Sequence, residues 1–201
     1  MADSTGTIRM WQDLPRPKDA VRLKVRESLA GLAVGKKARR SALACALLQR
    51  QAVWNNACSV LFYAPLPGEL DVWPLLEMAL KVGKIASLPR YSPASDAYIA
   101  CQVHDPQTDV QPGRFGIREP VANCQEIELN GLDLVLVPGL AFDLHGRRLG
   151  RGKGYYDHLL RLVRGKTCGV AFDEQVVNEV PVEGHDVVLN CILTPTRWVQ
   201  L

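Results

Sequence analysis

The sequence has no long run of apolar residues and no marked excess of charge of one sign. A helix that spans a bilayer needs roughly 18 consecutive apolar residues, and neither such a run nor a secretory signal segment occurs. The 24 lysines and arginines nearly balance the 21 aspartates and glutamates, which gives a formal net charge of +3. We therefore expect neither a membrane protein nor a general binder of nucleic acid, and any basic function has to be local.

The six cysteines are widely separated, and the sequence has no C-x-x-C motif and no cluster of cysteine and histidine. This spacing argues against the usual zinc sites and redox pairs. Most of the cysteines are therefore predicted to be small buried apolar residues. Together with the missing signal segment, this usage favours a reducing, cytoplasmic location. The sequence also lacks internal repeats and low-complexity tracts.

Length and composition favour one globular domain. The 201 residues are 47% hydrophobic and 22% charged, which is enough for a sizeable core. Residues 1–15 are polar and without periodicity, so we predict a flexible lead-in there and a single domain over residues 16–201. Apolar residues recur at helical spacing from Lys18 to Leu32, and the segment 36–54 predicts a second helix with basic residues at its start.

Short apolar segments alternate with helical ones in the rest of the chain. Residues 58–67 predict a buried strand, residues 69–83 a helix and residues 84–91 the next strand, an order typical of a parallel sheet. The clearest strand is "LDLVLVPGLAFD", at 132–143. Weaker patterns predict a strand at 98–104, a long loop at 105–125, a helix from about 156, and strands at 167–172 and 186–194. The predicted fold class is α/β, with a mostly parallel sheet covered on both faces.

The segment "RRLGRGKGYYDHLL", residues 147–160, follows the clearest strand and has three glycines at alternate positions. A loop that leaves the carboxyl end of a parallel strand and enters a helix is a common anion site. Glycines permit positive φ and a close approach of phosphate to the main chain, while arginine and lysine add charge. The residues concerned are Gly150, Gly152, Gly154, Arg148, Arg151 and Lys153. This chemistry suits a nucleoside triphosphate.

Other interpretations of the segment stay open at this point. It matches neither the Walker A frame nor the dinucleotide fingerprint G-x-G-x-x-G. Asp157 could hold Mg²⁺ that the phosphates share, or it could simply complement the helix dipole. The basic residues could also form an RNA contact, with Tyr155 and Tyr156 as stacking platforms.

The longer motif "VPGLAFDLHGRRLGRGKGYYDHLL" strongly resembles the signature of the 5-formyltetrahydrofolate cyclo-ligase family. Supporting matches occur in order along residues 16–201. They are Lys18 and Arg22 in a Lys-x-x-x-Arg pair, "YAPLPGELDV" around Glu69, "LPRY" at 88–91, "FGIREP" at 115–120 and "PVEGHD" at 181–186. The 138–157 part is highly specific, whereas the Lys-x-x-x-Arg pair alone carries no weight.

The resemblance implies a three-layer α/β/α fold like that of ribose-phosphate isomerase and CoA-transferase domains. It also implies ATP- and Mg²⁺-dependent conversion of 5-formyltetrahydrofolate to 5,10-methenyltetrahydrofolate, ADP and phosphate. ATP would phosphorylate the formyl oxygen, N10 would attack the activated carbon, and phosphate would leave. Such chemistry needs positioning and charge neutralisation more than a protein nucleophile. The expected partners are the folate and ATP, and the expected state is a monomer or a weak homodimer.

The resemblance carries the following site residues, each by its motif position. ATP contacts are implied at Lys18, Arg22, Arg148, Leu149, Gly150, Arg151, Gly152, Lys153, Gly154, Tyr155 and Tyr156. Folate contacts are implied at Tyr63 (or Ala64), Glu69, Arg151, Gly152, Lys153, Gly154 and Tyr155. Lys153 is expected to stabilise charge on the transferred phosphoryl group, with Arg151 as the second catalytic residue. The implied Mg²⁺ ligands are Asp157 and Asp186, with Glu183 as the alternative to Asp186.

Two rival functions remain beside the cyclo-ligase. One is an RNA-binding or regulatory protein that keeps the basic loop without turnover, and the other is an ATP-dependent enzyme with a different formylated or amide substrate. A set of Lys18, Arg22, Lys153 and Asp157 favours an enzyme, because an RNA contact has no need of the aspartate.

Overall fold

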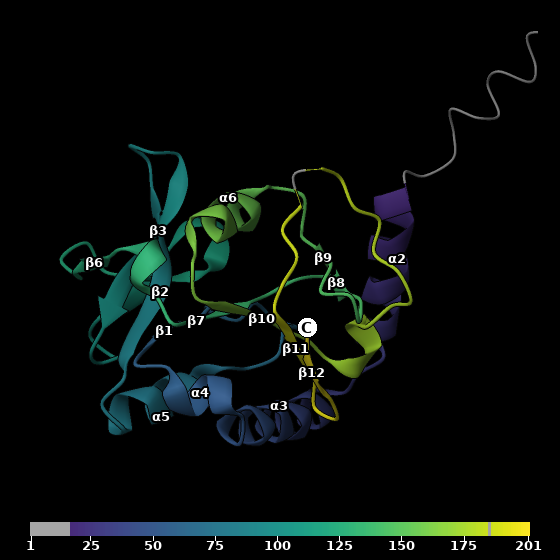
Figure 1. Ribbon diagram of the computed structural model, residues 1–201, viewed down its shortest axis with the longest axis horizontal. Coiled ribbons are helices and arrows are strands. Elements are labelled where there is room, and N and C mark those ends of the chain that lie inside the picture. The colour runs from purple at the N-terminus through teal and green to yellow at the C-terminus, as the bar shows by residue number, and fades with distance from the viewer. Residues whose placement is uncertain (1–16, 185) are drawn as a thin grey trace, which may run out of the picture.

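An eight-stranded sheet runs through the middle of the molecule (Figure 1). The computed structural model describes residues 17–184 and 186–201, so the lead-in predicted at 1–15 lies outside the described residues. Across the sheet the strands are β12 (Trp198–Gln200), β11 (Cys191–Leu193), β10 (Lys166–Val170), β7 (Leu134–Val137), β1 (Ser59–Leu61), β2 (Ile85–Ser92), β3 (Ala97–Val103) and β6 (Glu126–Ile127).

The five central strands of the sheet are parallel, which confirms the predicted α/β class. They lie in the order β2-β1-β7-β10-β11. Outside them, β12 pairs antiparallel with β11, β3 with β2, and β6 with β3. β1 and β7 lie side by side in the sheet. The connection that follows β1 leads to β2, on one side of this pair, whereas the connection that follows β7 leads to β10, on the other side. The reversal makes the gap between the carboxyl ends of β1 and β7 the place where open α/β sheets bind ligands.

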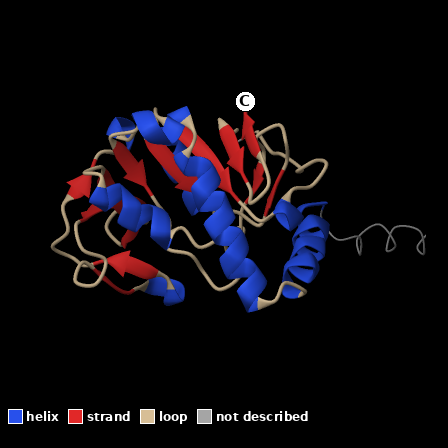
Figure 2. Cartoon of the chain, turned by 90° about the horizontal axis from the view of Figure 1, so that it is seen from below, coloured by secondary structure: helices blue, strands red, loops and turns tan. Residues whose placement is uncertain are grey.

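Helices cover both faces of the sheet. They are α2 (Pro17–Ala30), α3 (Val34–Gln49), α4 (Ala52–Asn56), α5 (Trp73–Lys81) and α6 (Tyr155–Leu162). In Figure 1 α3, α4 and α5 lie below the strands and α6 above them, and the first three lie in front of the strands in Figure 2. Right-handed crossovers that run in opposite directions from the centre of a sheet place their helices on opposite faces.

The clearest predicted strand shows how the sequence builds this core. Along β7 the side chains of Leu134 and Leu136 pack with the α3–α5 layer, while those of Val135 and Val137 pack with α6. Successive side chains of a strand point to opposite faces, so a continuous apolar run is what a strand buried on both faces requires. α2 packs separately, with Val25 against Leu149 and Val180.

The largest differences from the sequence expectation concern three segments. The helix expected at 36–54 is divided, because α3 ends at Gln49 and α4 begins at Ala52. The segment 105–125, expected to be a loop, contains a hairpin of β4 (Val110–Pro112) and β5 (Arg118–Pro120), with a 3₁₀ turn at Arg114–Gly116 between them. Strands of three residues that end in proline leave too little alternation for a pattern to reveal.

The third difference concerns the route into the glycine-rich loop. After β7 the chain forms a hairpin of β8 (Ala141–Phe142) and β9 (Arg148–Leu149) before the loop begins, so the loop does not leave β7 directly. The carboxylate of Asp143, fully buried, accepts hydrogen bonds from the backbone N–H groups of His145 (2.9 Å), Arg147 (3.1 Å) and Val180 (3.0 Å). These contacts fix the hairpin that returns the chain to the ligand edge of the sheet.

Replacing Asp143 with alanine should lower the free energy of unfolding by about 2–5 kcal/mol, because three backbone donors lose their acceptor in the interior. Urea denaturation measures this loss. The matched control is Glu179→Ala, since the Glu179 side chain is 75% exposed and pairs with Arg147 at the surface (2.9 Å); its cost should stay within about 0.5 kcal/mol. Equal costs for the two variants would contradict the role of Asp143.

Candidate functional site

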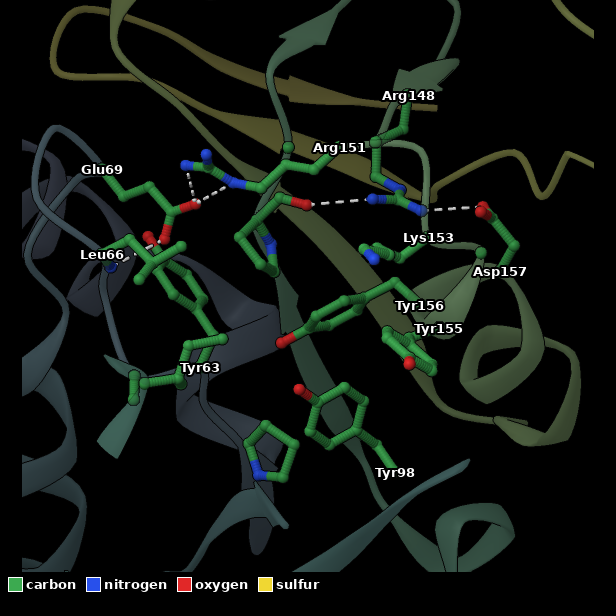
Figure 3. Close-up of a pocket in the computed structure, with 17 residues that line it drawn as sticks. Tyr63, Leu66, Glu69, Tyr98, Arg148, Arg151, Lys153, Tyr155, Tyr156 and Asp157 are labelled. Carbon is green, nitrogen blue, oxygen red and sulfur yellow. Dashed lines mark hydrogen bonds and ion pairs between the residues drawn. The ribbon is translucent and has the colours of Figure 1, made fainter. Parts of the chain in front are cut away.

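A cavity of about 330 Å³ lies at the carboxyl ends of β1 and β7 (Figure 3). The segment after β1 contributes Tyr63 and Glu69, and the segment after β7 contributes Pro138. The glycine-rich loop, residues 150–154, and the start of α6 close the remaining side. The cavity therefore occupies the position that the strand order predicts for a ligand, and its volume is in the range of small-molecule sites.

The glycine-rich loop bends by positive φ at two of its glycines. Gly152 has φ 95° and Gly154 has φ 71°, where Gly154 caps the start of α6. Gly150, the third glycine of the loop, does not have a positive φ. A Cβ at Gly150 would lie 3.1 Å from Nη1 of Arg148, so the absence of a side chain there leaves room for a guanidinium.

Arg148 turns inward and ties the loop to α6. Its side chain is 5% exposed, and its Nη2 lies 2.7 Å from Oδ1 of Asp157. Nη1 donates to the carbonyl of Pro138 (3.2 Å), and Nε is buried without a hydrogen-bond partner among the described residues. Its neighbour Leu149 is also buried, with its side chain in the core beside α2. ATP contacts at both residues stay predictions.

Arg151 and Glu69 form an ion pair across the cavity edge (Figure 3). Oε1 of Glu69 accepts from Nη2 (2.8 Å) and Nε (3.2 Å) of Arg151, and Oε2 accepts from the backbone N–H of Leu66 (3.0 Å). The Glu69 side chain is 9% exposed, whereas that of Arg151 is 45% exposed. Glu69, the carboxylate expected to bind the folate, is thus in direct contact with Arg151, an expected catalytic cation, although 82 positions separate them in sequence.

The hydroxyl of Tyr63 forms a hydrogen bond within the fold. Its hydroxyl donates to the carbonyl of Leu70 (2.8 Å), and burial raises its pKa well above the usual range. Tyr63 and Ala64 both line the cavity, so the structure brings both alternatives to the same wall. Because the hydroxyl is neutral, buried and hydrogen-bonded to the backbone, the part of Tyr63 that remains for a ligand is the face of its ring.

Aromatic rings make the opposite wall. Tyr98 and Tyr155 meet edge to face with ring centroids 5.3 Å apart, and Tyr91 packs against both at 6.0 Å. Burial raises the pKa of Tyr156, which also lines the cavity. Tyr98 was missed by the sequence analysis, because a single tyrosine in a weakly alternating strand carries no signal of its own. Pro89 and Ile117, which also line the cavity, lie within the motifs "LPRY" and "FGIREP".

Lys18 and Arg22, both on α2, contact two different segments of the chain: Lys18 contacts residues 183 and 186, and Arg22 contacts the glycine-rich loop. Nε of Arg22 donates to the carbonyl of Gly150 (3.3 Å), so this helix contacts the glycine-rich loop. Nζ of Lys18 lies 2.9 Å from Oδ2 of Asp186 and 3.3 Å from Oε1 of Glu183. Burial by itself would lower the pKa of Lys18, but the hydrogen bonds and charges of the two carboxylates raise it, so the amine stays charged.

The two expected metal ligands have different surroundings. Asp157 lines the cavity and pairs with Arg148, whereas Asp186 pairs with Lys18 and accepts the N–H of Glu183 (2.7 Å). Within residues 17–184 and 186–201, no three cysteine, histidine or acidic side chains are grouped as a metal site. Mg²⁺ commonly takes one or two carboxylates and completes its shell with water and phosphate oxygens, which is compatible with Asp157 as a single protein ligand.

These features define an α/β protein with a cavity lined by aromatic residues and by a basic glycine-rich loop, at the edge of its parallel sheet where such folds bind ligands. No helix in the described part of the chain is long and apolar enough to cross a bilayer. Comparison with known families makes the assignment specific: the model of the 5-formyltetrahydrofolate cyclo-ligase family matches residues 15–195. The chain belongs to this family.

Individual relatives agree with the family match. The 5-formyltetrahydrofolate cyclo-ligase of Escherichia coli K12 is 34% identical over 145 residues, which are 70% of this chain and 80% of that protein. The mouse protein of the same name is 29% identical over 192 residues, 88% of this chain and 92% of its own. The NMR structure of Aquifex aeolicus 5,10-methenyltetrahydrofolate synthetase superposes with a TM-score of 0.83 at 33% identity, covering 92% of this chain and 93% of that one.

Replacing Tyr63 with phenylalanine should lower the free energy of unfolding by about 1 kcal/mol, because the buried carbonyl of Leu70 loses its donor. Chemical denaturation measures the effect. Tyr91→Phe is the matched control, since the Tyr91 hydroxyl bonds to Asp96 at an exposed turn and its loss should cost less. A Tyr63 variant as stable as the unmodified chain would show that this hydroxyl is not a structural donor.

Proposed function

We propose that the chain catalyses the ATP-dependent cyclisation of 5-formyltetrahydrofolate to 5,10-methenyltetrahydrofolate, with release of ADP and phosphate. Its membership of the cyclo-ligase family makes it an enzyme of folate metabolism. The observation that carries the proposal is the contact of Glu69 with Arg151. It joins the residue expected to bind the folate to a residue expected to bind the phosphates, at the edge of one cavity. We further propose that residues 16–201 form one catalytic domain related to ribose-phosphate isomerase and CoA-transferase domains.

The proposed reaction has two steps. The formyl oxygen of the folate attacks the γ-phosphorus of ATP, a P–O bond breaks, and ADP leaves. N10 then attacks the activated carbon, the carbon–oxygen bond breaks, phosphate departs with the former formyl oxygen, and the N10 proton is lost to solvent. Neither step forms a bond to the protein, so the side chains have to position the reactants and neutralise charge.

The walls of the cavity suit these two tasks. Tyr98, Tyr155 and the ring of Tyr63 supply flat apolar surface for the pterin, and the Glu69 carboxylate can accept from paired N–H donors of its ring. Lys153, at the same cavity, is the proposed stabiliser of charge on the transferred phosphoryl group. The remaining proposed ATP contacts come from the loop and from Lys18 and Arg22 on α2.

The Glu69–Arg151 ion pair has to open for this reaction. Both groups are proposed to bind reactants, and in the structure each neutralises the other. We propose that the folate replaces Arg151 on Glu69 and that the released guanidinium turns to the ATP phosphates, whose oxygens match its planar fork. A buried carboxylate that loses one charged donor requires another, so the exchange suits a folate that brings N–H groups.

Magnesium is a proposed cofactor. When bound, Mg²⁺ would neutralise phosphate charge, and Asp157 is the proposed ligand that lines the cavity. Asp186, or Glu183 in its place, stays a proposed second ligand. An RNA-binding role has less support, because the Arg148 side chain is buried and Arg151 is directed to Glu69.

The formation of the methenyl product, which absorbs near-ultraviolet light, tests the proposed function. The unmodified chain should produce it from 5-formyltetrahydrofolate only when ATP and Mg²⁺ are present. Lys153→Ala should lower kcat by about 10²–10³-fold, as the loss of a charge stabiliser in a transition state does. Lys166→Ala, a lysine at the start of β10 that does not line the cavity, is the matched control and should keep the full rate. A folded chain without ATP-dependent product would refute the function.

Asp157→Asn should raise the Mg²⁺ concentration needed for half-maximal turnover by about tenfold, because a neutral amide is a poorer ligand for this cation than a carboxylate. A magnesium titration of the initial rate measures the shift. Because Asp157 also pairs with Arg148, the variant's unfolding curve is recorded as a control for damage to the fold. An unchanged titration in a folded variant would leave Asp157 as a partner of Arg148 and of the helix dipole only.

A further inference from the structure

A second cavity, of about 230 Å³, lies on the other side of the Glu69–Arg151 ion pair. Glu69, Arg151 and Gly139 line both cavities, so the ion pair is part of the wall between them. The outer wall comes from α2 and the start of α3, through Arg26 and Lys37. The family motifs that led to the first cavity include neither of these two residues.

The charges around the second cavity are mostly positive. Three cations line it, Arg26, Lys37 and Arg151, against the single carboxylate of Glu69. Both oxygens of Glu69 already accept hydrogen bonds from Arg151 and from the backbone. Neither Arg26 nor Lys37 forms an ion pair with any residue that the structure describes. Two cations without counter-charges therefore face one concave space, which favours an anion.

The spacing along α2 connects this space with the proposed nucleotide site. Lys18, Arg22 and Arg26 are four residues apart, so they follow one another along one face of the helix. Arg22 contacts the glycine-rich loop through the carbonyl of Gly150, and Arg26 lines the second cavity one turn further. A polar amide completes the wall: Gln175 is buried and donates to the carbonyls of Gly139 and Leu140, which keeps this side of the cavity fixed.

We propose that the second cavity is an oxyanion subsite, with Arg26 and Lys37 as its contacts and Arg151 as the cation that it shares with the first cavity. The assignment of its natural occupant rests on the proposed function, because either reactant could supply an oxyanion. ATP offers phosphates, and the folate offers the carboxylates of its glutamyl tail. The shared chemistry is a group with two or three anionic oxygens, which matches an arginine fork and a lysine point charge.

Calorimetric titration of the full chain with two probes tests this subsite. The probes are inorganic tripolyphosphate and a γ-linked triglutamate peptide, each added without the other reactant. The variants are Arg26→Gln and Lys37→Gln. Each has a control on the same helix, Lys24→Gln for α2 and Lys36→Gln for α3, because these exposed lysines line neither cavity. Thermal unfolding of all four variants shows whether they keep the fold.

Arg26→Gln and Lys37→Gln should each raise the dissociation constant of a bound probe about tenfold, and the control variants should change it less than twofold. Weakening of tripolyphosphate alone assigns the subsite to a nucleotide phosphate, and weakening of triglutamate alone assigns it to the folate tail. Probes that bind the variants as they bind the controls, or that fail to bind the unmodified chain, would overturn the proposal. Because this measurement does not use turnover, failure of the subsite proposal is distinguishable from failure of the proposed function.

Discussion

The ion pair of Glu69 and Arg151 is the contact on which the organisation of this site depends. It joins the segment after β1 to the glycine-rich loop, closes the edge of the first cavity and separates it from the second. A carboxylate that is 9% exposed needs a charged partner, and its removal from one costs several kcal/mol unless another donor replaces it. In the proposed reaction that donor is the folate, so the two groups that pair with each other in the structure are the ones proposed to bind the two reactants.

The sheet places this contact. Because β1 and β7 are neighbours whose connections run to opposite sides, the segments that follow them diverge and leave a gap at their carboxyl ends. The β8–β9 hairpin, held by the buried Asp143, then returns the chain to that gap. Arg148 secures the end of the hairpin to α6 through Asp157. Buried polar contacts thus fix the flanks of the loop, and Arg151 remains 45% exposed and able to change partner.

Much of the fold could be predicted from the sequence, because apolar runs such as 134–137 are long and bounded by turn residues. The β4–β5 hairpin and the β8–β9 hairpin could not, since strands of two or three residues carry no measurable period. For the site, the motifs indicated Glu69, Arg151 and Lys153, and the structure brings all three to one cavity. The burial of Arg148, the structural hydroxyl of Tyr63 and the wall made by Tyr98 depend on contacts between distant segments, which spacing along the chain does not encode.

The central claim is that both reactants meet at the gap between β1 and β7 and that Arg151 leaves Glu69 when they bind. A crystal structure of the chain with 5-formyltetrahydrofolate and a non-hydrolysable ATP analogue tests it most directly. We expect the pterin to lie against Tyr63 and Tyr98 with its N–H groups on Glu69, and the guanidinium of Arg151 to contact phosphate oxygens. A complex in which Glu69 and Arg151 stay paired, with the ligands bound elsewhere, would contradict the account.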